Sequence, residues 1–244
     1  MDQLKDFADE RLLVGCIYCG GPEETRDHVP CSVLLDHPLP ENLPVVPACR
    51  ECNQGFARDE EYFACLVEAV VSGTTDPDVV RRPRVAEILR RSPGLRARLE
   101  RAGRTEDGQT MFAIEPHRVR NVILKLARGH AAYELSHACR HDADAISWQP
   151  HTCMTDEDRD AFEEVQRVNR IDEIGSRQSQ RLLATQVTLQ GGAGEKLELG
   201  VLVNDWVEVQ EARYRYHAAS EDDVIRIRVV VGEYLACEVV WAFS

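Results

Sequence analysis

The chain has 244 residues, of which 43% are hydrophobic and 29% are charged, an ordinary composition for a folded protein with one large domain or two small ones. Its formal net charge of −13 argues against broad, non-specific attraction to nucleic acid, because phosphate binding depends on Lys and Arg. The N-terminus is acidic and no run of about 18 apolar residues occurs, so we expect no signal peptide, no membrane span and a cytoplasmic location.

Two Cys-x-x-Cys pairs dominate the first region, residues 1–73. Cys16 and Cys19 form one pair, Cys49 and Cys52 the other, and 29 residues separate the pairs. The nine cysteines are an odd number, and without a secretion signal this favours metal binding over disulfides. Four thiolates close a tetrahedral shell around zinc and leave no position for substrate, so we predict a structural zinc site. Two disulfides are the alternative.

Further polar residues lie between and just after these pairs. Asp27 and His28 precede Val29-Pro30, and Asn53 directly follows Cys52. Consecutive residues of a regular strand face opposite sides, so Asp27 and His28 serve one site only at a strand end, where Pro30 ends the ladder. Carboxylate and amide oxygens suit magnesium, and a neutral imidazole is a general base for a nearby water.

The middle region, residues 74–180, is predicted to be mainly helical, after a helix from about Asn53 to Gly73. The stretch "PRVAEILRRSPGLRARLERAG" predicts two short helices broken at Ser92-Pro93-Gly94, and "EPHRVRNVILKLARGHAAYELSHAC" predicts a long one with Pro116 in its first turn. The segment "TDEDRDAFEEVQRVNRID" predicts another helix, capped by Thr155.

The last region, residues 181–244, changes to alternation with period two. Three runs show it, and they are Leu197 to Val203, Ile225 to Val231 and Leu235 to Trp241. The stretches "QGGAGE" and "ASEDD" are predicted turns between strands. The sequence therefore predicts an α+β fold with a C-terminal antiparallel β-sheet.

Basic residues concentrate in one segment of this acidic chain. Residues 81–128 contain thirteen Lys and Arg against five Asp and Glu, an excess of eight positive charges. Such a segment contacts phosphates or forms a solvated helix face with internal ion pairs, and the sequence leaves both readings open.

The residues "CIYCG…RDHVP…ENLPVVPACRECN" resemble the motif of the HNH endonuclease family in its zinc-bound ββα-metal form, with Asn53 in the place of the last His. The same variant is similar to the nicking domain of RNA-guided CRISPR nucleases. The resemblance covers roughly Cys16 to Tyr62, and "KLARGHAAYEL" with the C-terminal strands is similar to small bacterial HNH proteins. No guide-RNA or target-recognition module is recognisable.

The resemblance implies a role for each matching residue. Asp27 and Asn53 would ligate a catalytic magnesium or manganese ion, His28 would activate the attacking water, and Asn42 would orient His28. Asn42 as a turn residue and Asn53 as a helix cap are the alternatives. Arg58 at the helix start is a candidate phosphate contact.

The sequence therefore predicts a metal-dependent endonuclease that hydrolyses phosphodiester bonds, with DNA as the favoured substrate and RNA as an open alternative. By analogy alone, we expect a component of host defence or of a mobile element. The alternative is a catalytically silent zinc module that binds nucleic acid or a protein. Because a lone acidic chain approaches DNA against its own charge, a homodimer or an activating partner is expected.

Overall fold

The computed structural model describes residues 13–106, 109–168, 176–190 and 196–242. Its helices are α1 (Arg50–Gly55), α2 (Ala57–Ser72), α3 (Pro83–Arg91), α4 (Pro93–Ala102), α5 (Pro116–Leu135), α6 (Asp156–Glu163) and α7 (Arg177–Arg181), with 3-10 turns at Ser32–Leu34 and His151–Cys153. Its strands are β1 (Thr25–His28), β2 (Val45–Ala48), β3 (Gly103–Glu106), β4 (Gln109–Phe112), β5 (Ala145–Pro150), β6 (Gln166–Val168), β7 (Leu183–Gln190), β8 (Lys196–Asn204), β9 (Val207–Gln210), β10 (Tyr214–Glu221), β11 (Val224–Val231) and β12 (Leu235–Ala242). The fold mixes helix and sheet, which confirms the α+β class.

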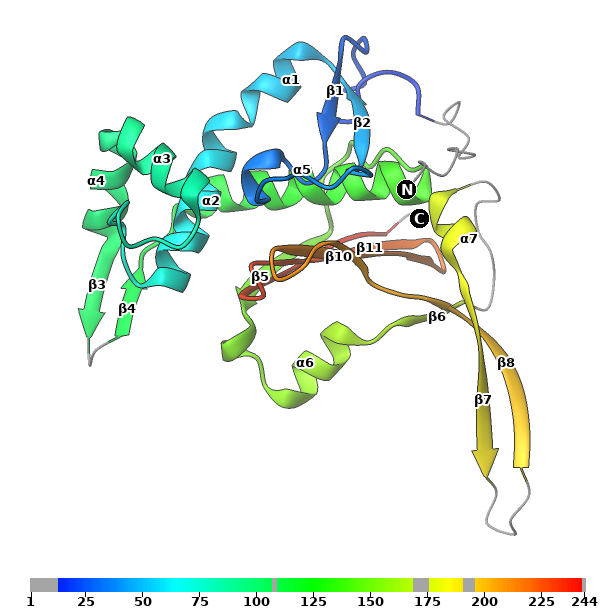
Figure 1. Cartoon of the computed structure of the whole chain (residues 1–244). Coiled ribbons are helices and arrows are strands. Elements are labelled where there is room, and N and C mark those ends of the chain that lie inside the picture. The colour runs from blue at the N-terminus through cyan, green and yellow to red at the C-terminus, as the bar shows by residue number, and fades with distance from the viewer. Residues whose placement is uncertain (1–12, 107–108, 169–175, 191–195, 243–244) are drawn as a thin grey trace.

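A five-stranded antiparallel sheet forms the centre, in the order β5-β12-β11-β10-β9. The long helix α5 lies across one face of this sheet, and α6 lies below the other face (Figure 1). The hairpin of β1 and β2, together with α1, stands on the far side of α5, while α3, α4 and the β3–β4 hairpin extend at one end (Figure 1). A second sheet, in the order β6-β8-β7, projects from the opposite end.

The main core lies between α5, α2 and the inner face of the central sheet. Alternate residues of β10, β11 and β12 point into it, including Tyr216, Ile227 and Trp241, each of which is at most 1% exposed. The N-terminal segment Cys31–Leu35, helices α2 to α5 and the C-terminal strands all contribute to this one cluster. Residues of all three sequence regions therefore share a single core.

Close packing fixes the N-terminal hairpin onto α5. A Cβ atom on Gly129 would lie only 2.5 Å from Val29 Cγ2, so the missing side chain lets the residue after β1 approach the helix. This contact explains a glycine in the middle of an otherwise continuous helix, where glycine ordinarily costs about 1 kcal/mol.

The helix predicted from about Asn53 to Gly73 is present but divided. It begins earlier, at Arg50, because Cys49 is the N-cap and its Sγ accepts the Cys52 amide hydrogen. Phe56 separates α1 from α2, and Gly73 ends α2 in the left-handed conformation, with φ of 67°. The paired helices α3 and α4, the long helix α5 and the strands at 225–231 and 235–241 are confirmed.

The helix predicted over residues 155–172 is wrong for residues 164–168. Thr155 caps α6 as expected. At the C-terminal end of α6, the buried Arg228 guanidinium donates hydrogen bonds to the carbonyl groups of Phe162 and Glu164. Residues 166–168 then pair with β8 as a strand, and 169–172 lie outside the described residues. The middle region also contains β3, β4 and β5, so it is less helical than predicted. The predicted "ASEDD" turn joins β10 to β11, and most of "QGGAGE" is not described.

Candidate metal centre and the neighbouring site

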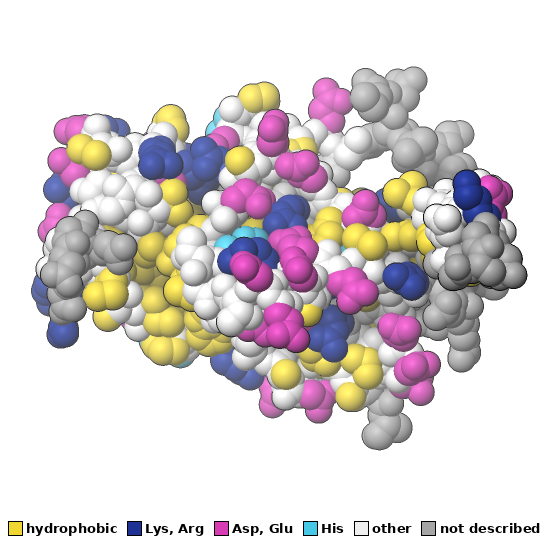
Figure 2. Space-filling view, turned by 90° about the horizontal axis from the view of Figure 1, so that it is seen from below, with side chains coloured by type: hydrophobic (Ala, Val, Ile, Leu, Met, Phe, Trp, Pro, Cys, Tyr) yellow, Lys and Arg dark blue, Asp and Glu magenta, His cyan; other side chains and the backbone are white. Residues whose placement is uncertain are grey.

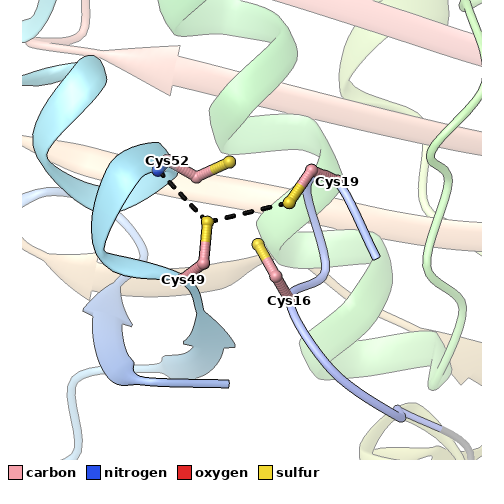
Figure 3. A group of neighbouring side chains, drawn as sticks. All are labelled: Cys16, Cys19, Cys49 and Cys52. Atoms are coloured by element: carbon pink, nitrogen blue, oxygen red, sulfur yellow. Dashed lines mark hydrogen bonds between the residues drawn. The ribbon is translucent and has the colours of Figure 1, made fainter. Parts of the chain in front are cut away.

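The four predicted cysteines come together at one point (Figure 3). Their Sγ atoms all lie within 4.8 Å of one another, and the Cys19 and Cys49 sulfurs are 3.7 Å apart. Tetrahedral zinc with Zn–S bonds of about 2.3 Å requires sulfurs about 3.8 Å apart, so the spacing fits that ion. Among the described residues, this is the one group of three or more His, Cys, Asp or Glu side chains with metal-ligand spacing.

Local backbone geometry builds this cluster. Cys16 and Cys19 lie in a tight turn in which the Cys16 N–H donates to the Gly21 carbonyl and the Gly20 N–H donates to the Cys16 carbonyl, both at 2.8 Å. Gly15 has φ of 74° and no room for a Cβ atom, which would lie 2.6 Å from the Gly21 oxygen. The glycine beside the first pair is therefore required by the turn.

Backbone N–H groups donate hydrogen bonds to sulfurs of the cluster. The Gly21 N–H donates to Cys19 Sγ at 3.4 Å, and the Cys52 N–H donates to Cys49 Sγ at 3.3 Å. Burial raises the pKa of Cys16, but hydrogen bonds from the backbone of Cys49, Cys19 and Tyr18 outweigh it and lower this pKa to about 7. The Gly21 N–H lowers the pKa of Cys19, but side-chain hydrogen bonds with Cys16 and Cys49 outweigh it and raise that pKa. Burial raises the pKa of Cys52 as well. Thiolates are the form that binds zinc, so zinc binding would release protons from these thiols.

Asp27 lies inside a buried ionic cluster, which we call the Lys125 cluster: Tyr18, Asp27, Glu60 and Lys125. The Lys125 ammonium, on α5, lies 2.9 Å from Asp27 Oδ2 and also pairs with Glu60 on α2. Tyr18 donates its hydroxyl hydrogen to Asp27 Oδ2 at 2.8 Å. Asp27 is 5% exposed and Lys125 is 2% exposed, so this cluster ties the N-terminal hairpin to two helices of the main core.

This arrangement does not fit a divalent ion at Asp27. Asp27 Oδ1 accepts a hydrogen bond from Lys125, and Oδ2 accepts one from Tyr18 and forms an ion pair with the same ammonium. A metal ion bound there would lie against the buried ammonium charge. Asn53 turns its amide nitrogen to β1, where it donates to Thr25 Oγ1 at 3.1 Å and to the Arg26 carbonyl at 3.2 Å. The predicted magnesium or manganese site at Asp27 and Asn53 gains no support from this geometry and stays a prediction.

His28 is exposed and faces away from Asp27. It is the last residue of β1, and the alternation of the strand places it on the outward face together with the exposed Arg26. Asn42 is exposed in the turn before β2, and in the described part of the chain no hydrogen bond joins its side chain to His28. Arg58 is exposed at the start of α2, and its carbonyl accepts a hydrogen bond from Arg118.

A cavity of about 580 Å³ opens beside the Lys125 cluster. It lies between the Cys31–His37 segment, the first turn of α2 and α3, and Glu60 forms part of its wall. Arg84 and Arg91 line it as well, but Arg84 donates to the Ser32 carbonyl and Arg91 pairs with Glu61. The lining of the cavity is therefore mixed, and two of its carboxylates are already paired, Glu61 with Arg91 and Glu60 with Lys125.

The basic segment is mostly neutralised too. Its thirteen Lys and Arg all lie in the described part, and seven of them form ion pairs: Arg82, Arg90, Arg91, Arg96, Arg98, Arg118 and Lys125. On the face seen from below, Asp and Glu side chains are scattered among the Lys and Arg side chains (Figure 2). For these seven residues the geometry favours the ion-pair reading over phosphate binding.

Sequence reasoning missed Lys125, Tyr18 and Glu60 as neighbours of Asp27. One signal was available for Lys125, which is the one charged residue in "VILKLA" and lies where helical spacing predicts a buried face. Arg26 was missed as well, although strand alternation alone places it on the same face as His28.

None of the protein-family models, curated proteins or solved structures compared with this chain matches it. No helix in the described residues combines the length and the apolar character needed to cross a membrane.

Proposed function

We propose that this chain is an endonuclease of the HNH type that hydrolyses phosphodiester bonds in DNA. The observation that carries the proposal is the exposed imidazole of His28, the last residue of β1, in the hairpin whose second strand leads directly into Cys49. Asn53 on α1 bonds to the same strand, so the motif residues belong to one compact unit of hairpin and helix, as a ββα-metal module requires.

Zinc, when bound by Cys16, Cys19, Cys49 and Cys52, would close the hairpin against α1 and supply folding free energy on the order of 10 kcal/mol. It would take no part in the reaction, because a four-thiolate shell leaves no open position. A reducing cytoplasm is part of this proposal. All nine cysteines lie in the described residues, and all are unpaired.

The chemistry we assign to the chain's own residues begins at His28. Its neutral imidazole takes a proton from a water molecule, whose oxygen bonds to phosphorus while the ester P–O bond breaks and the leaving oxygen takes a proton from solvent. Arg26, two residues earlier on the same face, would hold the phosphate through its guanidinium. In the structure Arg26 lies 3.3 Å from Glu23, an exposed ion pair that a phosphate can replace.

Plasmid cleavage tests this proposal, with purified wild type, His28→Ala and the control His117→Ala compared in EDTA, Mg²⁺ and Mn²⁺. His117 is exposed in the first turn of α5 and has no role in the proposal. We expect nicking by wild type and His117→Ala, and a loss of about 100-fold or more in His28→Ala with unchanged zinc content. Equal cleavage by His28→Ala and wild type would contradict the catalytic assignment.

A second candidate, the catalytically silent zinc module, is favoured by the Lys125 cluster. Asp27 is already paired with Lys125 and helps to hold the hairpin to the core, which is a structural use of that carboxylate. No cleavage by any of the three zinc-loaded proteins under any metal condition would select this candidate.

A further inference from the structure

The second sheet carries an arm that extends away from the body of the protein (Figure 1). We define the β7–β8 arm as residues 183–190 and 196–204, paired as an antiparallel hairpin from Leu183↔Val203 to Gln190↔Lys196. The short strand β6 pairs with the base of β8, at residues 202–204, and leaves the rest of the arm two-stranded. An isolated two-stranded hairpin is marginally stable in water, so the arm needs a covering layer.

The two faces of the arm differ sharply in polarity. Strand register places apolar side chains on one face, and they are Leu183, Val187, Leu199, Val201 and Val203. The opposite face carries mainly polar ones, among them Gln186, Thr188, Gln190, Lys196 and Glu198. Such alternation is typical of a sheet with one face in a core.

The apolar face is nevertheless exposed. Leu183 is 56% exposed, Leu199 42% and Val187 40%, and the neighbouring Thr185 is exposed as well. In the described part of the chain, no element packs over Leu183, Val187 and Leu199 closely enough to bury them. Exposed apolar faces rimmed by polar residues mark interaction sites.

Buried polar contacts hold the base of the arm rigidly. Asn204, at the end of β8, is 4% exposed and donates to the Ala218 carbonyl of the central sheet at 2.8 Å and to Gln166 Oε1 at 3.1 Å. Just before β7, Arg181 pairs with the fully buried Glu134 of α5 at 2.6 Å. The apolar face is therefore presented in a fixed orientation, which lowers the entropic cost of binding.

The net charge of the chain and the lack of charge on the apolar face indicate which kind of partner the arm binds. The described residues of the apolar face include no carboxylate, and a chain of net charge −13 meets another copy of itself with least repulsion through such an uncharged surface. Nucleic acid and anionic membranes are disfavoured, because both require Lys and Arg, and Arg167 beside Val203 is the one basic residue paired onto this face in the described part.

We propose that the apolar faces of two β7–β8 arms pack against each other across a two-fold axis and make the protein a homodimer. A two-fold interface uses the same patch on both copies, and apolar-on-apolar packing is self-complementary without any charge pattern. Each arm then gains the second layer that it lacks, as in a small β-sandwich. The proposal is independent of catalysis.

The size of the face predicts a weak dimer. Eight residues at about 3.4 Å each give a length of about 27 Å, and two strands are roughly 10 Å wide with their side chains. This footprint is well below the roughly 800 Å² per partner of a standard stable interface. We therefore expect a dissociation constant on the order of micromolar and a monomer–dimer equilibrium that responds to dilution.

Sedimentation velocity over about a hundredfold range of concentration tests the proposal. Wild type is expected to shift from monomer to dimer, and Val187→Glu is expected to weaken the dimer about 100-fold, because each copy would place an unpaired charge in the interface. Gln186→Glu is the matched control, with the same charge added one residue away on the polar face, and it is expected to dimerise like wild type. A wild type that stays monomeric throughout, or equal disruption by both variants, overturns the proposal.

Hydrogen exchange of wild type alone provides a second measurement that does not depend on a variant folding. Raising the protein concentration is expected to slow amide exchange in residues 183–190 and 196–204. Slower exchange elsewhere, with no change in the β7–β8 arm, would assign the dimer to another surface and would refute the inference.

Discussion

Replacing Lys125 by methionine is expected to destabilise the folded protein by about 3–5 kcal/mol. Methionine keeps much of the length and apolar stem of lysine, so the change removes mainly the charge. The ammonium is the one cation among the described residues that contacts both Asp27 and Glu60, and its side chain is 2% exposed. Water cannot take its place, and the formal charge of the Lys125 cluster would change from −1 to −2.

The pH dependence of this effect follows from the pKa of Lys125. Burial by itself lowers that pKa, but the carboxylates of Asp27 and Glu60 outweigh burial and raise it above its ordinary value. A lysine with a raised folded pKa contributes its full stability below the unfolded value of about 10.4, and loses it as pH rises through the folded pKa. The difference between wild type and variant is therefore expected at neutral pH and should shrink as pH rises through the folded pKa of Lys125.

Urea unfolding at pH 7, followed by circular dichroism, measures the loss. Lys196→Met is the control, because Lys196 is exposed on β8 and should change the free energy of unfolding by less than about 0.5 kcal/mol. Adding Glu60→Gln to Lys125→Met should recover part of the loss, since one buried carboxylate is then neutral. A loss below about 1 kcal/mol in Lys125→Met would show that the ion pairs contribute little, and the reasoning would fail.

Three further outcomes are expected. Cys19→Ser should lower the zinc content and the unfolding temperature, whereas Cys153→Ser, a change at another exposed cysteine, should alter neither, as metal analysis and calorimetry will show. Gly129→Ala should destabilise by about 1–3 kcal/mol through overpacking, while Gly55→Ala, with open space around its Cβ position, should stabilise by up to about 1 kcal/mol in urea unfolding. Burial and the nearby Arg228 lower the pKa of His217 to about 4, so the protein should lose about 3 kcal/mol of stability between pH 6.5 and pH 4, and His217→Gln should reduce that pH dependence.

Local patterns in the sequence were sufficient to predict the elements that residues close together in the chain determine. The Cys-x-x-Cys spacing brought four sulfurs together, and Pro116 and Gly73 marked a helix start and a helix end. Alternation over residues 225–231 and 235–241 predicted two neighbouring strands of the central sheet. Each of these signals involves residues that lie close together in the chain.

The partners of these elements could not be predicted in the same way, because the deciding contacts are distant in sequence. Asp27 meets Lys125 across 98 residues, and nothing near Asp27 indicates that its carboxylate is already paired. The end of α6 depends on Arg228, 66 residues after Phe162. A single sequence gives the periodicity of a helix but not the side chain that will bond to its last carbonyl groups.

The separation between Asp27 and Lys125 also has a consequence during synthesis. At roughly 5–20 residues per second, a ribosome adds Lys125 about 5 to 20 seconds after Asp27, whereas the fourth cysteine, Cys52, follows within a few seconds. A nascent hairpin that binds zinc through its four cysteines would therefore do so while the Asp27 carboxylate is still hydrated and unpaired. Such binding would precede attachment of the hairpin to the core, which waits for the arrival of α5.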